Sequence, residues 1–432
     1  MNRIFLVGNG FDQAHKLPTR YEDFINWYWA KWNQRLLYGK TRIEEDEFYS
    51  FKLKDDIQLA GWYLIWEWYF HTNPLSKNKY NYVEIAQKGN SFCTINSKSE
   101  LFKDICNSYR GKNWVDIESE YYNHIFSPKY SVSSSIRKLN DQFETVRIKL
   151  IEYLSTIQEA ISKDSTIQKM NEIFYEPIRK RDIAVSSLNH WYEFVKQRNQ
   201  YTMEEWVNYI SELKNKKYDS YLIQYDVQSV NEKYTKYIQN LDFQSFDNEQ
   251  IPDYYILPNR TLLLNFNYTT MADMYLPESC RYLVNHIHGQ LSDPDSIIFG
   301  YGDEIDKHYS ELTEFNDNEY LRHIKSFKYL ESSNYKNLLS FIDSEPYQIC
   351  IMGHSCGISD RTLLKTLFEH PNCVSIKPYY YKQSSGQDNY LDIVQNISRN
   401  FSDMRLMRDR VVNKTLCTYL PQKEAEQQHI DE

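Results

Sequence analysis

The stretch "FLVGNGFDQAHKLPTRYEDF", residues 5–24, lies almost at the start of the chain and decides how the fold begins. Ile4–Val7 are apolar and have the pattern of a short strand that is buried on both faces, as in a parallel sheet. Gly8 and Gly10 follow, and glycine permits a sharp turn and the close approach of backbone to a ligand. A strand, a glycine turn and a helix together direct backbone N–H groups at a phosphate. Because Gln13 stands where the dinucleotide-binding fingerprint has its third glycine, a phosphate site and a plain tight turn both fit this stretch.

Length and composition describe a globular protein with a large helical part. The chain has 432 residues, which suggests roughly two to three domains. Hydrophobic residues make up 41% and charged residues 25%, and with only 12 Gly and 12 Pro the chain has few loop-forming residues. The net charge of −9 argues against a nucleic-acid partner, because phosphate backbones bind positively charged surfaces.

The cysteines and the N-terminus indicate a cytoplasmic location. The 7 cysteines are odd in number and include no Cys-x-x-Cys pair, which fits free thiols in a reducing compartment. The first residues have the pattern of a buried strand rather than of a secretory signal. The most apolar segment, residues 62–70, is too short to span a bilayer and contains Glu67. We therefore expect a cytoplasmic protein without a membrane partner.

Strand and helix patterns divide the chain into two kinds of structure. Strands are predicted at the N-terminus and again at residues 261–266, 281–289, 296–302, 347–353 and 373–380. Helical patterns separate the last of these strands, so we expect the α/β class, with a parallel sheet covered by helices on both faces. The N-terminal strand would complete that sheet.

The predicted domains follow from this division. One α/β domain would combine residues 1–40 with 255–412, and residues 41–254 would form a helical insertion. Residues 413–432 would be a C-terminal segment that ends in a disordered tail. Within the insertion, apolar residues recur at spacings of three and four from Ile136 to Ile161, which predicts one long helix packed along its apolar face.

Polar residues and glycines follow five of the predicted strands, where ligands bind in a parallel sheet. They are Gly8, Asn9, Gly10 and Asp12, then Asn265, Asn267 and Thr269, then His286 and His288, then Gly300 and Asp303, and finally Gly353, His354, Ser355 and Asp360. Each also has a structural interpretation. The Asn residues suit turns, the two His alternate on one face of a strand, and Asp360 suits a helix N-cap. Their conjunction is what favours a functional site.

Several motifs resemble a known family. The stretches "GNGFDQAHKLPTRYEDF", "NFNY", "HIHG", "IFGYGD" and "GHSCGISD", in that order, resemble the AbiH abortive-infection family of bacterial phage-defence proteins. "NWVDIESEY", at 113–121, resembles a further element of that family. The family in turn is similar to the sirtuin-like NAD-binding fold. The resemblance implies a sirtuin-like, Rossmann-like nucleotide-binding domain with a large helical insertion, and an NAD glycohydrolase that releases nicotinamide.

The resemblance also implies which residues bind the diphosphate. In sirtuin-like enzymes the glycine turn after the first strand surrounds the pyrophosphate, a position that corresponds to Gly8, Asn9 and Gly10 here. Phe11 and Asp12 follow directly and are counted with the same binding site. NAD is therefore expected as a substrate, and no metal ion is expected.

The remaining roles implied by the resemblance concern the two riboses. Asn267 would lie at the nicotinamide ribose, and His288 would act as base toward a ribose hydroxyl or water. Gly353, His354 and Ser355 would contact the adenosine ribose.

The chain departs from sirtuins in ways that bear on its activity. Asn9 stands where sirtuins have a small residue, and Thr269 where an Asp often follows the Asn-Tyr pair. The zinc-ribbon cysteines of protein deacylases are absent, which argues against deacylation of protein lysines.

Two other functions compete with NAD hydrolysis. One is a nucleotide-binding sensor or partner-binding defence module without turnover. The other is a metal-dependent nuclease or phosphoesterase that would use His286, His288, Asp303 and His354. NAD or a related nucleotide is the expected partner, with a phage-derived trigger and a second copy of the chain as further candidates.

Overall fold

Two compact units make up the computed structural model, which describes residues 1–66, 92–112, 116–198, 256–276, 281–302, 304 and 307–423. The first unit comprises Met1–Lys16, Ile161–Gln290 and Tyr329–Glu432, and the second comprises Leu17–Ala160 and Leu291–Lys328. The domains expected from the sequence have other borders than these units, and those expected borders stay a prediction.

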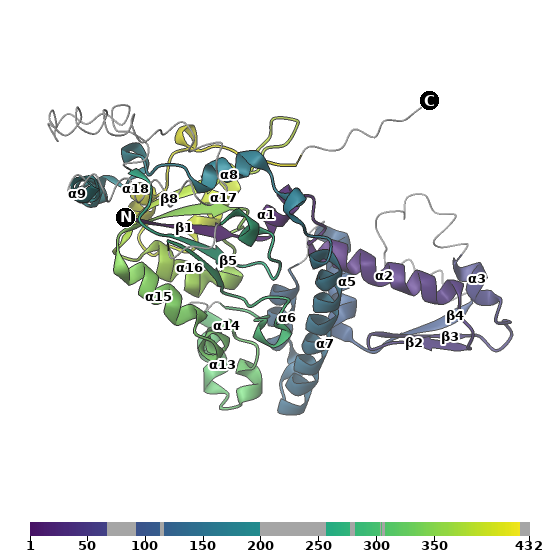
Figure 1. The fold of residues 1–432 in the computed structure, drawn as a ribbon. Helices are drawn as coiled ribbons and strands as arrows, with labels where there is room; N and C mark the ends of the chain where they lie inside the picture. Colours follow the sequence, from purple (N-terminus) through teal and green to yellow (C-terminus); the bar gives the residue numbers. More distant parts are fainter. Residues whose placement is uncertain are drawn as a thin grey trace, which may run out of the picture. The chain divides into compact units, whose positions relative to one another are not determined.

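A five-stranded parallel sheet forms the centre of the first unit (Figure 1). Its strands are β1 (Asn2–Val7), β5 (Thr261–Asn265), β6 (Tyr282–His286), β7 (Tyr347–Met352) and β8 (Cys373–Tyr379). They are ordered β6-β5-β1-β7-β8, and each neighbouring pair is parallel. The chain therefore adds strands on one side of β1 and then on the other, and such a switch point is where open α/β sheets bind ligands. The expected α/β class with a parallel sheet is confirmed.

Helices cover both faces of this sheet, which explains why its strands are almost continuously apolar. On one face, α15 (Asn334–Ser344) and α16 (Arg361–Phe368) lie near each other (Figure 1), and the Tyr347 hydroxyl donates to the Leu367 carbonyl at 2.8 Å. On the other face, Phe174 of α8 (Gln168–Phe174) packs on Phe5, with ring centroids 4.5 Å apart. The unit also contains α1 (Asn9–Ala14), α9 (Leu188–Arg198), α17 (Tyr390–Ser398) and α18 (Met404–Arg410).

A buried polar network lies on the α8 face of the sheet. Arg3 in β1 donates to the Oε1 atom of Gln348 in β7 at 2.9 Å. Lys377 in β8 forms ion pairs with Asp182 at 3.1 Å and Glu176 at 3.2 Å. These partners are what permit charged side chains in strands that have no exposed face.

The C-terminal segment returns to the sheet and to α1. The Leu420 amide donates to the Tyr380 carbonyl just after β8, and the Lys423 amide donates to the Ala14 carbonyl at the end of α1, both at 2.8 Å. Residues 424–432, on which the expectation of a disordered tail falls, lie outside the described residues.

The second unit is mainly helical. Its helices are α2 (Tyr21–Leu37), α3 (Gly61–Trp66), α5 (Glu100–Lys112), α6 (Ile117–Ile125), α7 (Ser133–Gln158), α13 (Lys307–Glu314) and α14 (Lys325–Lys328). The long helix expected from the apolar spacing is α7, and the predicted face is buried from Ile136 to Leu154. That expectation is confirmed, while Ile157 and Ile161 are only half-buried.

Two sequence expectations about strands are wrong. The sequence predicts that 41–254 is helical, yet β2 (Ile43–Glu45), β3 (Tyr49–Leu53) and β4 (Cys93–Ser97) form a three-stranded antiparallel sheet there. Conversely, residues 296–302 do not form a sheet strand, and Tyr301 makes a single bridge to Ile324.

Aromatic packing, and not strand pairing, accounts for the apolar run at 296–302. Phe299 stacks on Phe143 of α7 at 4.6 Å, and Tyr301 stacks on Tyr122 of α6 at 3.9 Å between ring centroids. Glu118, in the "NWVDIESEY" element, accepts a hydrogen bond from the Gly300 amide at 3.1 Å. The apolar residues are thus buried by helices in the second unit.

No helix in the described ranges is long and apolar enough to cross a membrane.

The buried face of α7 makes a prediction about stability. Leu150 is 3% exposed, so Leu150→Ala should lower the free energy of unfolding by about 2 to 5 kcal/mol, through lost burial and a cavity. Ile148, on the same helix, is 53% exposed, and Ile148→Ala should change stability by less than about 0.5 kcal/mol. Urea unfolding of both variants tests this, and equal losses would contradict the assignment of the buried face.

Candidate functional site

Four neighbouring strands end in predicted site residues at the same edge of the sheet. Gly8 follows β1, Asn267 follows β5, His288 follows β6 and His354 follows β7. All strands of this sheet are parallel and β5, β1 and β7 are neighbours, so their carboxyl ends lie side by side. The expectation that strand ends distant in sequence gather here is confirmed for four of the five predicted strands, whereas residues 296–302 form no strand of this sheet.

The glycines after β1 let two chain segments approach each other closely. A Cβ atom on Gly8 would lie 2.6 Å from the Cα atom of His354, and one on Gly10 would lie 2.8 Å from the carbonyl oxygen of Gly353. Gly353 has φ +77°, and a Cβ atom there would lie 2.1 Å from the backbone nitrogen of Phe11. The Gly8 residue itself has φ −127°, a value open to any amino acid. Close chain packing, and not left-handed backbone, therefore requires Gly8.

The contact between the turn after β1 and the chain at the end of β7 also engages the backbone amides of Gly8 and Gly10, which the family resemblance assigns to diphosphate binding. The Gly8 amide donates to the Met352 carbonyl at 3.3 Å, and the Gly10 amide donates to the Gly353 carbonyl at 2.9 Å. Both glycine N–H groups are thus bonded within the protein. A ligand at this edge of the sheet would have to form its hydrogen bonds with groups other than these two amides.

Asp12, Asn267 and Thr269 form a buried cluster beside this turn, which we call the Asp12 cluster. The Thr269 hydroxyl donates to Oδ2 of Asp12 at 2.6 Å, and the Asn267 side-chain amide donates to the Gly8 carbonyl at 3.1 Å. Asp12 is 1% exposed, and its Oδ1 atom has no hydrogen-bond partner within the described structure. Burial raises the pKa of Asp12 to about 7. Its carboxyl group therefore changes charge near neutral pH.

Asn265 accounts for the local shape of the "NFNY" turn. Its side-chain oxygen accepts a hydrogen bond from the backbone amide of Asn267 at 2.9 Å, and its side-chain nitrogen donates to the backbone carbonyl of Thr269 at 3.1 Å. This is the turn-forming role that Asn commonly has. The turn thereby fixes the backbone on both sides of Asn267.

A carboxylate lies between the two predicted histidines. Nε2 of His288 is 3.3 Å from Oδ1 of Asp360, and Nε2 of His354 is 3.6 Å from Oδ2 of the same residue. Phe266 contacts both imidazoles, with ring centroids 5.1 Å from His288 and 4.2 Å from His354. The Tyr329 hydroxyl lies 3.2 Å from Nε2 of His288. We call His288, His354 and Asp360 the His–Asp–His cluster.

Hydrogen bonds assign the protonation of one of these rings. Nδ1 of His354 accepts a hydrogen bond from the Cys356 amide at 3.0 Å, so the proton of the neutral ring is on Nε2, the atom that faces Asp360. Asp360 occupies the N-cap position of α16, yet its side chain makes no capping hydrogen bond. Its carboxylate faces the imidazoles instead. A carboxylate in this position orients an imidazole and stabilises its protonated form.

The other predicted site residues divide into exposed and buried ones. Asn9 and Ser355 are exposed at the ends of β1 and β7, where a ligand can reach them. Phe11 has no exposed surface and packs against His15 and Tyr275, at 4.7 and 5.6 Å between ring centroids, so its ring is a core side chain. A direct contact between that ring and a ligand would require the core to open.

His286 and His288 do not act as a pair on one face, as their spacing suggested. The β6 strand ends at His286, so strand alternation does not extend to His288. Nε2 of His286 contacts Asp273 at 2.9 Å, whereas His288 contacts Asp360. Asp303 lies outside the described residues. Over the described ranges, no group of three or more His, Cys, Asp or Glu side chains has an arrangement that would hold a metal ion.

The sequence comparisons place these motifs in one family. A family model described as "Bacteriophage abortive infection AbiH" matches residues 4–381. The chain belongs to the AbiH family. The match includes the glycine turn, both clusters and the sheet that positions them. A search of curated proteins and a search of solved structures each gave no match.

The close contact of Gly353 with the turn after β1 makes a prediction about the stability of this AbiH-family protein, and Gly386 supplies the control. Gly353→Ala should lower the free energy of unfolding by about 2 to 5 kcal/mol, because it adds a clash with Phe11 to the strain of positive φ. Gly386 has φ +90° and no atom within 4 Å of the place that a Cβ atom would take, so Gly386→Ala should cost only about 1 to 2 kcal/mol. Urea unfolding compares the two, and equal costs would show that the segments need not touch.

The buried Asp12 carboxyl makes a prediction about pH. Its pKa rises from 3.8 to about 7 on folding, so between about pH 4 and 7 the folded chain binds a proton that the unfolded chain releases. The contribution of Asp12 to stability therefore falls as the pH rises through this window and is constant above it. Asp12→Asn removes this dependence.

Relative to the wild-type protein, we expect Asp12→Asn to gain up to about 1.4 kcal/mol of unfolding free energy per pH unit from pH 5 to 7. Urea unfolding at pH 5, 6, 7 and 8 measures this difference. Buried His15 and His323, whose pKa values burial lowers to about 4, are present in both proteins and cancel. Parallel stability profiles would contradict a raised pKa at Asp12.

Proposed function

We propose that this AbiH-family protein hydrolyses the bond between nicotinamide and ribose in NAD, at the edge of the sheet where β1, β5, β6 and β7 end. The observation that carries the proposal is the gathering of Asn267, His288 and His354, at the ends of β5, β6 and β7, around the turn at Gly8 that follows β1. The family match connects the chain with abortive infection. The choice of NAD as substrate rests on the resemblance of its sequence motifs, in their order, to those of sirtuin-like enzymes.

The reaction needs a positioned base and little other covalent chemistry. The bond between the ribose C1′ atom and the nicotinamide nitrogen breaks, and its electron pair passes to the pyridinium nitrogen, so nicotinamide leaves as a neutral molecule. A water oxygen bonds to C1′ and its proton passes to the imidazole of His288. A base of this kind contributes about 10²- to 10⁴-fold to a rate.

Asp360 and Asn267 would act by positioning. Because Asp360 faces Nε2 of His288 at 3.3 Å, the lone pair of the neutral ring would be on Nδ1, and the carboxylate would stabilise the imidazolium that forms. The Asn267 amide is oriented by the Gly8 carbonyl, so its other polar atom, Oδ1, would align the ribose or the water.

The nucleotide contacts are assigned to the exposed residues of the switch point. Asn9 and Ser355 are exposed at the adjacent ends of β1 and β7, whereas the Gly8 and Gly10 amides are bonded within the protein. The buried state of His288, 5% exposed, favours a second candidate function, a sensor that binds the nucleotide without turnover. Binding and release of nicotinamide distinguish the two.

The test follows free nicotinamide over time with purified protein and NAD, with and without lysate from phage-infected cells. His288→Ala and Asn267→Ala should lower the rate about 10²- to 10⁴-fold and leave the NAD affinity, measured by calorimetry, largely unchanged. Asp360→Asn should lower the rate and move the acidic limb of the pH–rate profile to lower pH, because the imidazolium loses its carboxylate.

An Asp–His pair at the other edge of the sheet supplies the matched control. Asp343 pairs with His370 at 3.1 Å, near the opposite ends of the strands, so Asp343→Asn should leave both the rate and the profile unchanged. NAD binding without nicotinamide release under either condition would identify a sensor. Absence of both binding and release would overturn the proposal.

A further inference from the structure

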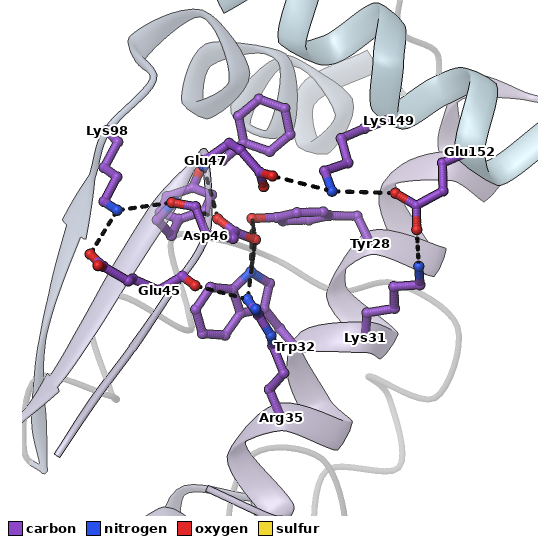
Figure 2. A network of polar contacts seen from close by, with 12 residues as sticks. Tyr28, Lys31, Trp32, Arg35, Glu45, Asp46, Glu47, Lys98, Lys149 and Glu152 are labelled. Atoms are coloured by element: carbon purple, nitrogen blue, oxygen red, sulfur yellow. Dashed lines mark hydrogen bonds and ion pairs between the residues drawn. The ribbon is translucent and has the colours of Figure 1, made fainter. Parts of the chain in front are cut away.

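A cavity of about 520 Å³ lies in the second unit, in a part of the chain that the proposed reaction does not use. Its volume is in the range of small-molecule sites. It lies between α2, the turn that joins β2 and β3, the end of β4, and α7 (Figure 2). The described side chains around it are four cations, four carboxylates and three aromatic rings.

Asp46 forms a fixed part of the wall. One carboxylate oxygen accepts hydrogen bonds from the Tyr28 hydroxyl at 2.9 Å and from the Trp32 indole nitrogen at 3.0 Å. The other accepts from the backbone amides of Phe48 at 2.8 Å and Tyr49 at 2.9 Å. With these donors and only 11% exposure, this carboxylate is held in place and its charge is largely compensated.

The described residues place four cations around the cavity, and three of these have a described partner other than a glutamate side chain. The Lys31 ammonium lies 4.0 Å from the centre of the Trp27 ring, a cation–π contact. The Arg35 guanidinium lies 5.2 Å from the centre of the Trp32 ring. Lys98 donates to the backbone carbonyl of Asp46 at 2.9 Å. These contacts keep the positive charges near the cavity whether or not the glutamates remain.

The three glutamates, unlike Asp46, are exposed and, among the described residues, are held by ion pairs alone. Glu45 pairs with Lys98 at 2.7 Å, Glu47 pairs with Lys149 at 3.5 Å, and Glu152 pairs with Lys31 and with Lys149 (Figure 2). Within the described structure, lysine ammonium groups are the sole partners of these three carboxylates. Their side chains are 43% to 57% exposed, and ion pairs at such positions contribute little to stability.

This asymmetry gives the cavity a preference for one sign of ligand charge. A negatively charged ligand can displace the glutamates into solvent and keep cations that have other partners. A positively charged ligand would instead have to remove lysines from an indole face and from a backbone carbonyl.

We propose that this cavity binds a small molecule carrying two or more linked phosphate groups, whose oxygens take the places of the glutamate carboxylates on Lys31, Lys98 and Lys149. Phosphate oxygens suit this set, because each lysine supplies a compact charge with several donors. In the free protein the glutamates occupy these lysines as competing anions. The site is independent of NAD hydrolysis, since none of its residues belongs to the first unit.

The test measures inorganic tripolyphosphate binding to the full chain by calorimetry. Lys149→Gln should weaken binding about 10- to 100-fold, because it removes a charged hydrogen-bond donor. Glu152→Gln should strengthen binding up to about fivefold, because it removes a competing anion. Affinity should fall as the salt concentration rises.

Two exposed residues near the same helix supply matched controls. Lys138→Gln in α7 and Glu159→Gln at its end change the same charges outside the cavity and should leave binding unchanged. Urea unfolding of each variant checks that the fold persists. His288→Ala should bind tripolyphosphate as the wild-type protein does, which separates this site from the sheet edge.

Two results would overturn the proposal. One is the absence of saturable tripolyphosphate binding to the wild-type protein at low salt. The other is weaker binding of Glu152→Gln in parallel with Lys149→Gln, which would show that the ion pairs only build the wall of the cavity.

ATP in place of tripolyphosphate identifies the source of the phosphate chain. Equal affinities would show that an inorganic chain satisfies the site, and tighter binding of ATP would show that the nucleoside contacts the wall as well.

Discussion

The close contact between the turn after β1 and the loop after β7 is the constraint on which the sheet edge depends. It works only because Gly8, Gly10 and Gly353 have no side chains to separate the two segments. Two amide–carbonyl hydrogen bonds then join the segments. The contact places His354 beside Gly8, and the Gly8 carbonyl in turn orients Asn267. Backbone contacts and the side-chain amide of Asn267 therefore position three strand ends without any ligand.

Because the backbone amides at this contact are already bonded, polar side chains are the groups that determine the chemistry of the sheet edge. The carboxyl groups of Asp12 and Asp360 are both buried, but their surroundings differ. Asp12 has a hydroxyl donor and an unpartnered oxygen, and its raised pKa allows a neutral form near pH 7. Asp360 lies between two imidazoles. One edge of the sheet thus contains two buried carboxyl groups, one bonded to a hydroxyl and the other placed between two imidazoles.

The sequence predicts the parts of the fold that have a clear periodicity. Four strands of the second half and the α7 face follow from apolar runs and from spacings of three and four, although the edge strand β6 is only partly buried. The β3 strand also carries a period of two, with Tyr49, Phe51 and Leu53 buried between outward Ser50 and Lys52, a signal that local pattern does contain. At 296–302 an equally apolar run is buried by the rings of Phe143 and Tyr122, which come from distant helices. Local pattern does not distinguish these two kinds of burial.

The candidate site could likewise be predicted from the sequence only in part. That strand ends would gather follows from parallel topology, and the structure brings Gly8, Asn267 and His354 together. Which atoms meet depends on loops whose shape no local pattern specifies. Asp360 suited an N-cap by position, yet its side chain faces His288 and His354. The Gly8 and Gly10 amides suited a phosphate by motif, but Met352 and Gly353 already accept their hydrogen bonds.

The central position of β1 in the sheet has a consequence for synthesis on the ribosome. Arg3 leaves the ribosome 345 residues before Gln348, its hydrogen-bond partner in β7. At about 5 to 20 residues per second, β1 waits roughly 15 to 70 s for the strand that completes its second side. During that time a strand that is buried throughout in the folded protein has an unpaired edge. A ribosome that stops before Tyr347 therefore releases a chain in which the switch point does not exist.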